Sequence, residues 1–166
     1  MTPSLALGGR YAAGEEAKLA SDHGIRGVVD LREEACDDKA ALARMGIAFL
    51  HLPTSDHQPP APSDLDRGVE FVRERLGQGQ RVLIHCEHGI GRSAVLMLCV
   101  LVDAGVEPLD ALRQTKGARE EVSPSPKQYM GWSAWLVSRG KTAPDAHTFG
   151  CIAYRHSAKT DQMVAS

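Results

Sequence analysis

Hydrophobic and polar residues follow two patterns along this chain, short apolar runs and longer amphipathic stretches. The apolar runs predict strands at residues 28–31, 48–52 and 82–84. The amphipathic stretches predict helices at residues 15–23, 36–45, 63–76 and 93–104, and two more that begin at Pro108 and Pro126. Alternating strands and helices predict an α/β domain with a central, mostly parallel sheet and helices on both of its faces.

Two details of this pattern concern the ends of helices. Ser63 is expected to cap the helix at 63–76, with Asp66 three residues later. The helix that begins at Pro126 should end before Gly140, and the regular pattern ends with it. We therefore predict one main domain at residues 1–140. Residues 141–166 are expected to be a frayed tail or a small addition to the sheet.

The segment with the clearest chemistry is residues 85–93, which read His-Cys-Glu-His-Gly-Ile-Gly-Arg-Ser. It joins a predicted strand to a predicted helix, where free N–H groups and the helix dipole attract anions. Gly89 and Gly91 allow backbone angles barred to other residues, so that the loop N–H groups can surround a phosphate. Arg92 can bind two oxygens of that dianion. The same positive surroundings should lower the pKa of the Cys86 thiol and make it a nucleophile.

Two simpler interpretations of this segment stay open at this point. Cys86 could be a small buried apolar residue, although that would not explain the glycines or Arg92. His85, Cys86 and His88 could bind a metal, but structural zinc sites usually have four ligands. The other cysteines occur singly in the sequence: Cys36, Cys99 and Cys151. We therefore expect no metal and no cofactor.

The string His-Cys-x5-Arg-Ser, with Gly-x-Gly-Arg inside it, resembles the loop of the cysteine-dependent protein tyrosine phosphatases. The short chain is similar to the dual-specificity branch of that superfamily, over roughly residues 5–138. The resemblance implies a metal-independent phosphomonoester hydrolase that forms a phosphocysteine at Cys86. It also implies that the phosphate binds Arg92 and the loop N–H groups of these residues: Glu87, His88, Gly89, Ile90 and Gly91.

Asp56 is the best candidate for the proton donor that such a reaction requires. It is the only carboxylate of the proline-rich segment 53–60, thirty residues before Cys86. In dual-specificity phosphatases a loop of similar content supplies the general acid. Asp56 could instead only cap a turn, and His57 is a weaker candidate for the acid.

The resemblance gives roles to three further residues, a catalytic role to Ser93 and supporting roles to His85 and Gln128. Ser93 would donate a hydrogen bond to the thiolate, and His85 would be held by backbone hydrogen bonds and help to fix the loop. Gln128 occupies a position where many relatives carry a glutamine that orients water, but it could also be a surface residue of a first helical turn. Glu87 should disfavour a heavily phosphorylated ligand, because relatives that act on such ligands tend to carry lysines in the loop.

Composition excludes some partners. The chain is 43% hydrophobic and 24% charged, as in ordinary globular proteins, and its net charge of −2 favours neither nucleic acid nor an anionic membrane. The N-terminus lacks the pattern of a signal peptide, and the longest apolar run, residues 94–102, is too short to span a bilayer. We expect a cytoplasmic enzyme that acts on phosphotyrosine in proteins, and also on phosphoserine or phosphothreonine, or on a small phosphomonoester.

Several alternatives belong beside this hypothesis. The same scaffold could hydrolyse a phosphoinositide, an inositol phosphate or an RNA 5′-phosphate. A rhodanese-like sulfurtransferase also uses a loop cysteine, and a phosphotyrosine-binding module would keep the pocket without catalysis. A separate hypothesis is redox protection, in which Cys36 forms a disulfide with an oxidised Cys86.

Overall fold

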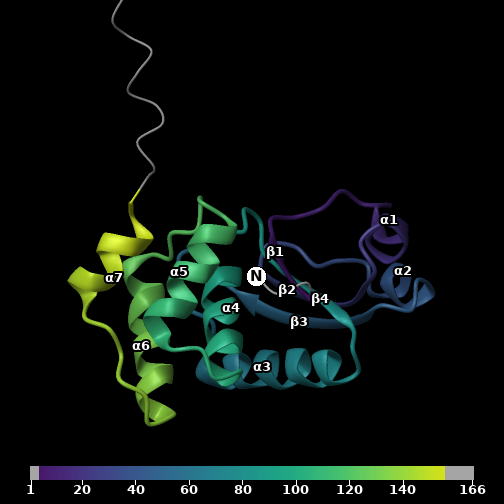
Figure 1. Cartoon of the computed structure of the whole chain (residues 1–166). Helices are drawn as coiled ribbons and strands as arrows, with labels where there is room; N and C mark the ends of the chain where they lie inside the picture. Colours follow the sequence, from purple (N-terminus) through teal and green to yellow (C-terminus); the bar gives the residue numbers. More distant parts are fainter. Residues whose placement is uncertain (1–3, 156–166) are drawn as a thin grey trace, which may run out of the picture.

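Figure 1 shows the chain as a computed structural model, which describes residues 4–155. Four strands form one sheet, and seven helices surround it within the described residues. The strands are β1 (Leu5–Gly8), β2 (Ile25–Arg32), β3 (Ala48–Thr54) and β4 (Arg81–His85). The helices are α1 (Glu16–Ser21), α2 (Lys39–Arg44), α3 (Pro62–Gly77), α4 (Arg92–Asp103), α5 (Pro108–Ala118), α6 (Pro126–Ser138) and α7 (Ala146–Ala153).

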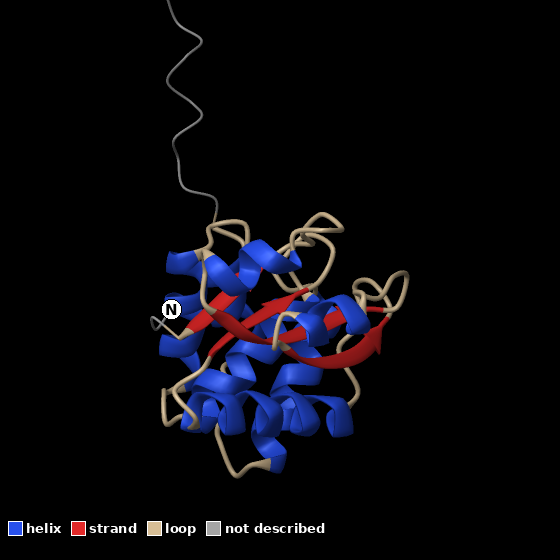
Figure 2. Ribbon diagram, turned by 90° about the vertical axis from the view of Figure 1, so that its right-hand side faces the viewer, coloured by secondary structure: helices blue, strands red, loops and turns tan. Residues whose placement is uncertain are grey.

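All strand pairs of the sheet are parallel, in the order β1-β4-β2-β3 (Figure 2). The short helices α1 and α2 lie at one side of the sheet, at the right of Figure 1, over a small cluster that contains Ile25, Val28 and Leu42. The longer helices α3 and α4 pack against the opposite face. The predicted fold class is confirmed. Because the strands are parallel, the loops that follow β2, β3 and β4 meet at one edge of the sheet.

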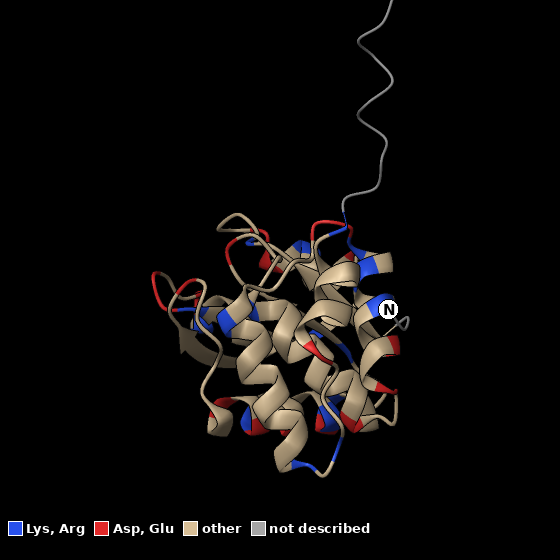
Figure 3. Cartoon of the chain, turned by 90° about the vertical axis from the view of Figure 1, so that its left-hand side faces the viewer, with Lys and Arg blue, Asp and Glu red and all other residues tan. Residues whose placement is uncertain are grey.

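Helix α4 is the centre of the core. Eleven of its twelve residues are buried, and all of those beyond Ser93 are apolar. Such a helix can only be stable inside the protein, so the loop between β4 and α4 is anchored at both ends by buried elements. In Figure 3 charged residues of both signs lie interspersed along loops and helix ends. Among residues 4–155, none of the helices combines the length and apolar character that crossing a bilayer requires.

The structure corrects the predicted element ends. Strand β1 was not predicted, and it pairs with β4 at the edge of the sheet. The predicted cap at Ser63 is wrong, because α3 begins at Pro62 with Ala61 at the N-cap position and no side-chain cap. Proline is well suited to the first helical position, since it fixes φ and has no N–H to leave unpaired. Helices α1 and α2 are shorter than predicted, and β2 is longer.

Helix α7 is neither a frayed tail nor an addition to the sheet. Asp145 caps it by accepting a hydrogen bond from the Thr148 N–H. Phe149 is only 1% exposed, with its ring centre 4.7 Å from that of Tyr129 and 5.9 Å from that of Trp132. Helix α7 therefore belongs to the same core as α6. The part of segment 141–166 beyond residue 155 lies outside the described residues, and the domain boundary at 140 stays a prediction.

We predict that Phe149→Ala lowers the free energy of unfolding by about 3–5 kcal/mol, because it leaves a cavity among packed aromatic rings. Chemical denaturation of the whole chain measures this. Val137→Ala on α6 is the matched control, since Val137 is 65% exposed and its truncation should change stability by less than about 0.5 kcal/mol. An unchanged unfolding free energy for Phe149→Ala would show that α7 is not part of the cooperative fold.

Candidate active site

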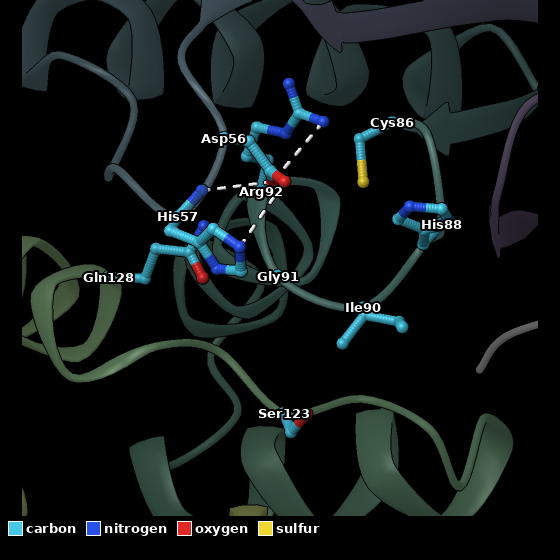
Figure 4. Close-up of a pocket in the computed structure, with 9 residues that line it drawn as sticks. All are labelled: Asp56, His57, Cys86, His88, Ile90, Gly91, Arg92, Ser123 and Gln128. Atoms are coloured by element: carbon cyan, nitrogen blue, oxygen red, sulfur yellow. Dashed lines mark hydrogen bonds and ion pairs between the residues drawn. The ribbon is translucent and has the colours of Figure 1, made fainter.

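A pocket of about 350 Å³ opens at the carboxyl ends of β3 and β4. In Figure 4 Cys86 and His88 lie on one side of it, and His57 and Gln128 lie on the other. Three segments supply its walls: the loop after β3, the loop after β4, and the connection from α5 into α6. The residues that line it are Asp56, His57, Cys86, His88, Ile90, Gly91, Arg92, Ser123 and Gln128.

The thiol of Cys86 is buried and accepts hydrogen bonds. Its Sγ lies 3.2 Å from the Ser93 hydroxyl oxygen and 3.3 Å from the Gly89 backbone nitrogen. Burial opposes ionisation of the thiol, but the contacts with Ser93 and Gly89 and the charge of Arg92 favour the thiolate more strongly. Together they hold the pKa of Cys86 below its usual value. The sulfur is therefore prepared to act as a nucleophile.

The two glycines of the loop are required for different reasons. Gly89 has φ +70°, and a Cβ there would lie 2.6 Å from the Gly8 carbonyl oxygen, so the prediction of special backbone angles is right at this position. It is wrong for Gly91, whose φ of −118° is accessible to any residue. A Cβ at Gly91 would instead lie 3.0 Å from the Gln128 amide nitrogen and still closer to its amide oxygen. Gly91 is thus needed for a close approach to α6.

Arg92 forms an ion pair with the carboxylate of Glu34, a residue that the sequence pattern did not indicate. Its two terminal nitrogens each lie 2.7 Å from one oxygen of Glu34, and Nη1 also donates to the Thr54 carbonyl at 2.9 Å. The hydrogen bonds from Arg92 lower the pKa of Glu34 to about 2. The Arg92 Nε is buried and has no hydrogen-bond partner among the described residues. This arrangement fixes the guanidinium and leaves a donor for a ligand.

Asp56 lies at the rim of the pocket, and in Figure 4 a dashed line joins its carboxyl group to the guanidinium of Arg92. Its Oδ1 is 3.5 Å from Arg92 Nη2 and accepts a hydrogen bond from the His57 N–H at 3.0 Å. The Asp56 side chain is 56% exposed. It can therefore reach a group that enters the pocket while it keeps contact with water.

His85 is held by a carboxylate rather than by the backbone hydrogen bonds that were expected. Its Nε2 lies 2.7 Å from Asp37 Oδ2, and the ring's hydrogen bond to a backbone group, the Cys86 carbonyl, is long at 3.4 Å. Asp30, Asp37 and His85 offer ligand atoms within 4.8 Å of one another. Arg32, however, forms hydrogen bonds to both carboxylates. A metal ion would have to displace this cation, so the cluster is better described as a buried ion-pair network.

The Glu87 side chain differs from expectation, and one of the two alternatives for Gln128 is excluded. The Glu87 carboxylate is paired with Arg10 at 2.8 Å and lies 3.6 Å from Arg32. It does not line the pocket, so repulsion of a heavily phosphorylated ligand has no direct basis in this geometry.

Gln128 is not a surface residue, because it is only 2% exposed. Its amide accepts from the Ser125 N–H and donates to the Gln58 carbonyl.

Arg119, at the end of α5, holds the outer side of the loop and was missed by the sequence analysis. It donates from Nη2 to the His88 carbonyl at 2.9 Å and from Nε to the Gly89 carbonyl at 3.1 Å. The His88 carbonyl and the Gly89 N–H belong to the same peptide group, and this N–H donates to Cys86 Sγ. A cation on the carbonyl polarises that N–H toward the sulfur. Arg119 therefore supports the thiolate through the backbone.

We predict that Arg119→Met raises the pKa of the Cys86 thiol, because the variant no longer polarises the Gly89 N–H toward the sulfur. The pH dependence of iodoacetamide alkylation measures this, followed at Cys86 by peptide mass spectrometry because Cys36 and Cys151 are exposed.

Arg113→Met is the control, because Arg113 lies on the same helix and pairs only with Asp110 among the described contacts. An unchanged alkylation profile for Arg119→Met would exclude this role of Arg119.

Several known proteins are similar to this chain in sequence and in structure. Human "Phosphatidylglycerophosphatase and protein-tyrosine phosphatase 1" is 29% identical over 133 residues, which is 76% of this chain and 66% of the human protein. Its rat counterpart is 30% identical over 118 residues, 67% of this chain and 61% of that protein. The chain thus spans somewhat less than two thirds of these relatives.

Solved structures and a protein-family model also match this chain, and they point to the same kind of protein. The structure of Tk-PTP in its active form matches with a TM-score of 0.73 and 27% identity, over 84% of this chain and 99% of that one. PTPMT1 in complex with PI(5)P shares the fold, with a TM-score of 0.76 and 24% identity, over 83% and 95%. The family described as "Polymorphic toxin system, DSP-PTPase phosphatase" matches residues 6–106. The chain belongs to this family of dual-specificity-type phosphatases, within the cysteine-dependent protein tyrosine phosphatase superfamily.

Proposed function

We propose that this protein hydrolyses phosphomonoesters through a phosphocysteine at Cys86, with phosphotyrosine and phosphoserine or phosphothreonine proteins as its substrates. One observation carries the proposal. A buried thiol with a lowered pKa lies in one pocket with the guanidinium of Arg92 and the carboxyl group of Asp56. A nucleophile, an oxyanion-binding cation and a proton donor are the parts that phosphoryl transfer to a cysteine requires.

In the first step the Cys86 thiolate attacks phosphorus, and the bond between phosphorus and the leaving oxygen breaks. Arg92 and the N–H groups of residues 87–91 bind the three non-bridging oxygens as negative charge shifts onto them. Asp56 donates its proton to the leaving oxygen, which departs as an alcohol or a phenol. The buried Nε of Arg92, which has no hydrogen-bond partner within residues 4–155, is a suitable donor for one of those oxygens.

In the second step a water molecule attacks the phosphocysteine. Asp56, now a carboxylate, takes a proton from that water, and inorganic phosphate and the thiolate are released. Ser93 stabilises the departing thiolate, since its hydroxyl oxygen lies 3.2 Å from the sulfur. The Gln128 side chain borders the pocket, in a position to restrict where the water enters.

The charges of the pocket favour a substrate with a single phosphate. Among the residues that line it, Arg92 is the only arginine or lysine, and Glu34 and Asp56 already share part of its charge. A polyphosphorylated headgroup would find no second cation of this kind there. A lipid phosphomonoester is the second candidate substrate, because the relative in human is named a phosphatidylglycerophosphatase as well as a protein-tyrosine phosphatase.

We predict that the protein hydrolyses p-nitrophenyl phosphate in the presence of a metal chelator. Cys86→Ser should abolish this activity, because it removes the nucleophile. Asp56→Asn should remove the fall in rate at high pH, since that fall reflects loss of the acidic proton. Measurement of kcat/KM against pH for the three proteins tests these expectations.

A substrate panel then distinguishes the candidate substrates. It compares a phosphotyrosine peptide, a phosphoserine peptide, phosphatidylglycerophosphate in vesicles, an inositol phosphate and an RNA 5′-phosphate by kcat/KM. Activity that survives in Cys86→Ser would contradict the mechanism. An inactive wild-type protein that still binds a phosphotyrosine peptide would favour the binding module.

A further inference from the structure

The loop that carries Asp56 is attached to α6 at three consecutive residues. The Ser125 hydroxyl donates to the His57 carbonyl at 2.7 Å, and the Gln128 amide donates to the Gln58 carbonyl at 3.1 Å. The next loop residue, Pro59, packs directly on Gly131. Their partners are the N-cap residue of α6, Ser125, and positions 128 and 131 within the helix. Residues spaced three apart lie on one face of a helix.

Gly131 is the closest of these contacts. A Cβ at this position would lie 2.9 Å from Pro59 Cγ and still closer to Pro59 Cβ, a separation that real Cβ atoms do not show. No positive φ requires glycine at Gly131. The absence of a side chain therefore serves the approach of the acid loop.

His57 gives a second indication that the loop is held in place. It has φ +60°, the only positive φ of a non-glycine residue among residues 4–155. Such a conformation costs free energy and persists only where surrounding contacts impose it. Those contacts are present on both sides, since the His57 N–H binds Asp56 and its carbonyl binds Ser125. The strained residue lies next to the carboxyl group that the mechanism uses.

We propose that the face of α6 formed by Ser125, Gln128 and Gly131 is a docking platform that sets the position of the Asp56 loop, and that Gly131 is its positioning residue. The inference rests on the proposed role of Asp56 as the general acid. A methyl group at Gly131 would push Pro59 away from α6 and move Asp56 relative to the leaving oxygen, while Cys86 and Arg92 stay in place.

Gly131→Ala tests this through the leaving group. Phenyl phosphate needs protonation because its leaving phenol has a pKa of about 10, whereas p-nitrophenolate is a weaker base and depends on the acid less. We expect kcat/KM, which reports the first step alone, to fall about tenfold or more for phenyl phosphate and distinctly less for p-nitrophenyl phosphate. In an Asp56→Asn background, Gly131→Ala should cause no further loss, because both changes remove the same interaction.

Gly117→Ala is the matched control. Gly117 also lies inside a helix, but a Cβ there would meet nothing within 4 Å, so both activities should stay unchanged. Thermal unfolding of each variant shows whether it folds. If Gly131→Ala does not fold, Pro59→Ala, which removes ring atoms from the contact without adding any, should give the same selective loss more weakly.

The outcomes separate the inference from the proposed function. The docking role of Gly131 would be overturned if Gly131→Ala lowered kcat/KM equally for phenyl phosphate and p-nitrophenyl phosphate. It would also be overturned if Gly131→Ala lowered kcat/KM as much in the Asp56→Asn background as in the wild type. If Asp56→Asn itself lowers kcat/KM equally for the two substrates, the acid role of Asp56 fails, and the inference fails with it.

Discussion

The structure depends on the surroundings of one buried thiol, Cys86, whose ionised form has to be stabilised inside the protein. Cys86 is 3% exposed, and removing a thiolate from water costs free energy unless hydrogen bonds and positive charge replace the lost hydration. The loop provides this replacement through the Ser93 hydroxyl, the Gly89 N–H and Arg92. In a trans peptide group the N–H and the carbonyl point in opposite directions, so each N–H that faces the sulfur leaves a carbonyl that faces outward. The surrounding elements must bind those carbonyls.

The outer partners of the loop come from distant parts of the chain. Arg119 and the Ser123 N–H bind the carbonyls of His88, Gly89 and Ile90. The segment that contains them is in turn fixed by α7, since the Tyr154 hydroxyl donates to the Pro124 carbonyl. Helix α7 lies beyond the 6–106 range matched by the family, yet it contributes to the support of the nucleophile loop. The part of the protein that supports the Cys86 loop is therefore larger than the motif at residues 85–93.

Sequence reasoning worked where the determining residues are neighbours in the chain. The string 85–93 combines strand end, glycines, cysteine and arginine within nine positions, so the loop and its chemistry could be predicted locally. Glu34 and Arg119 reach the same loop from 58 and about 30 residues away, and an isolated charge in a polar stretch carries no sign of such a contact. Gly131 likewise shows no local reason to be glycine. Helix α7 was missed because its buried side depends largely on Phe149 and Ala153.

Direct observation of the phosphocysteine tests the central claim most directly. Asp56→Asn is mixed with p-nitrophenyl phosphate and quenched rapidly, and the tryptic peptide of residues 82–92 is analysed by mass spectrometry. Because Asp56 also activates the second step, we predict that a phosphoryl group accumulates on Cys86 in this variant. Turnover with no phosphoryl group on Cys86, or with the group on another residue, would contradict the account.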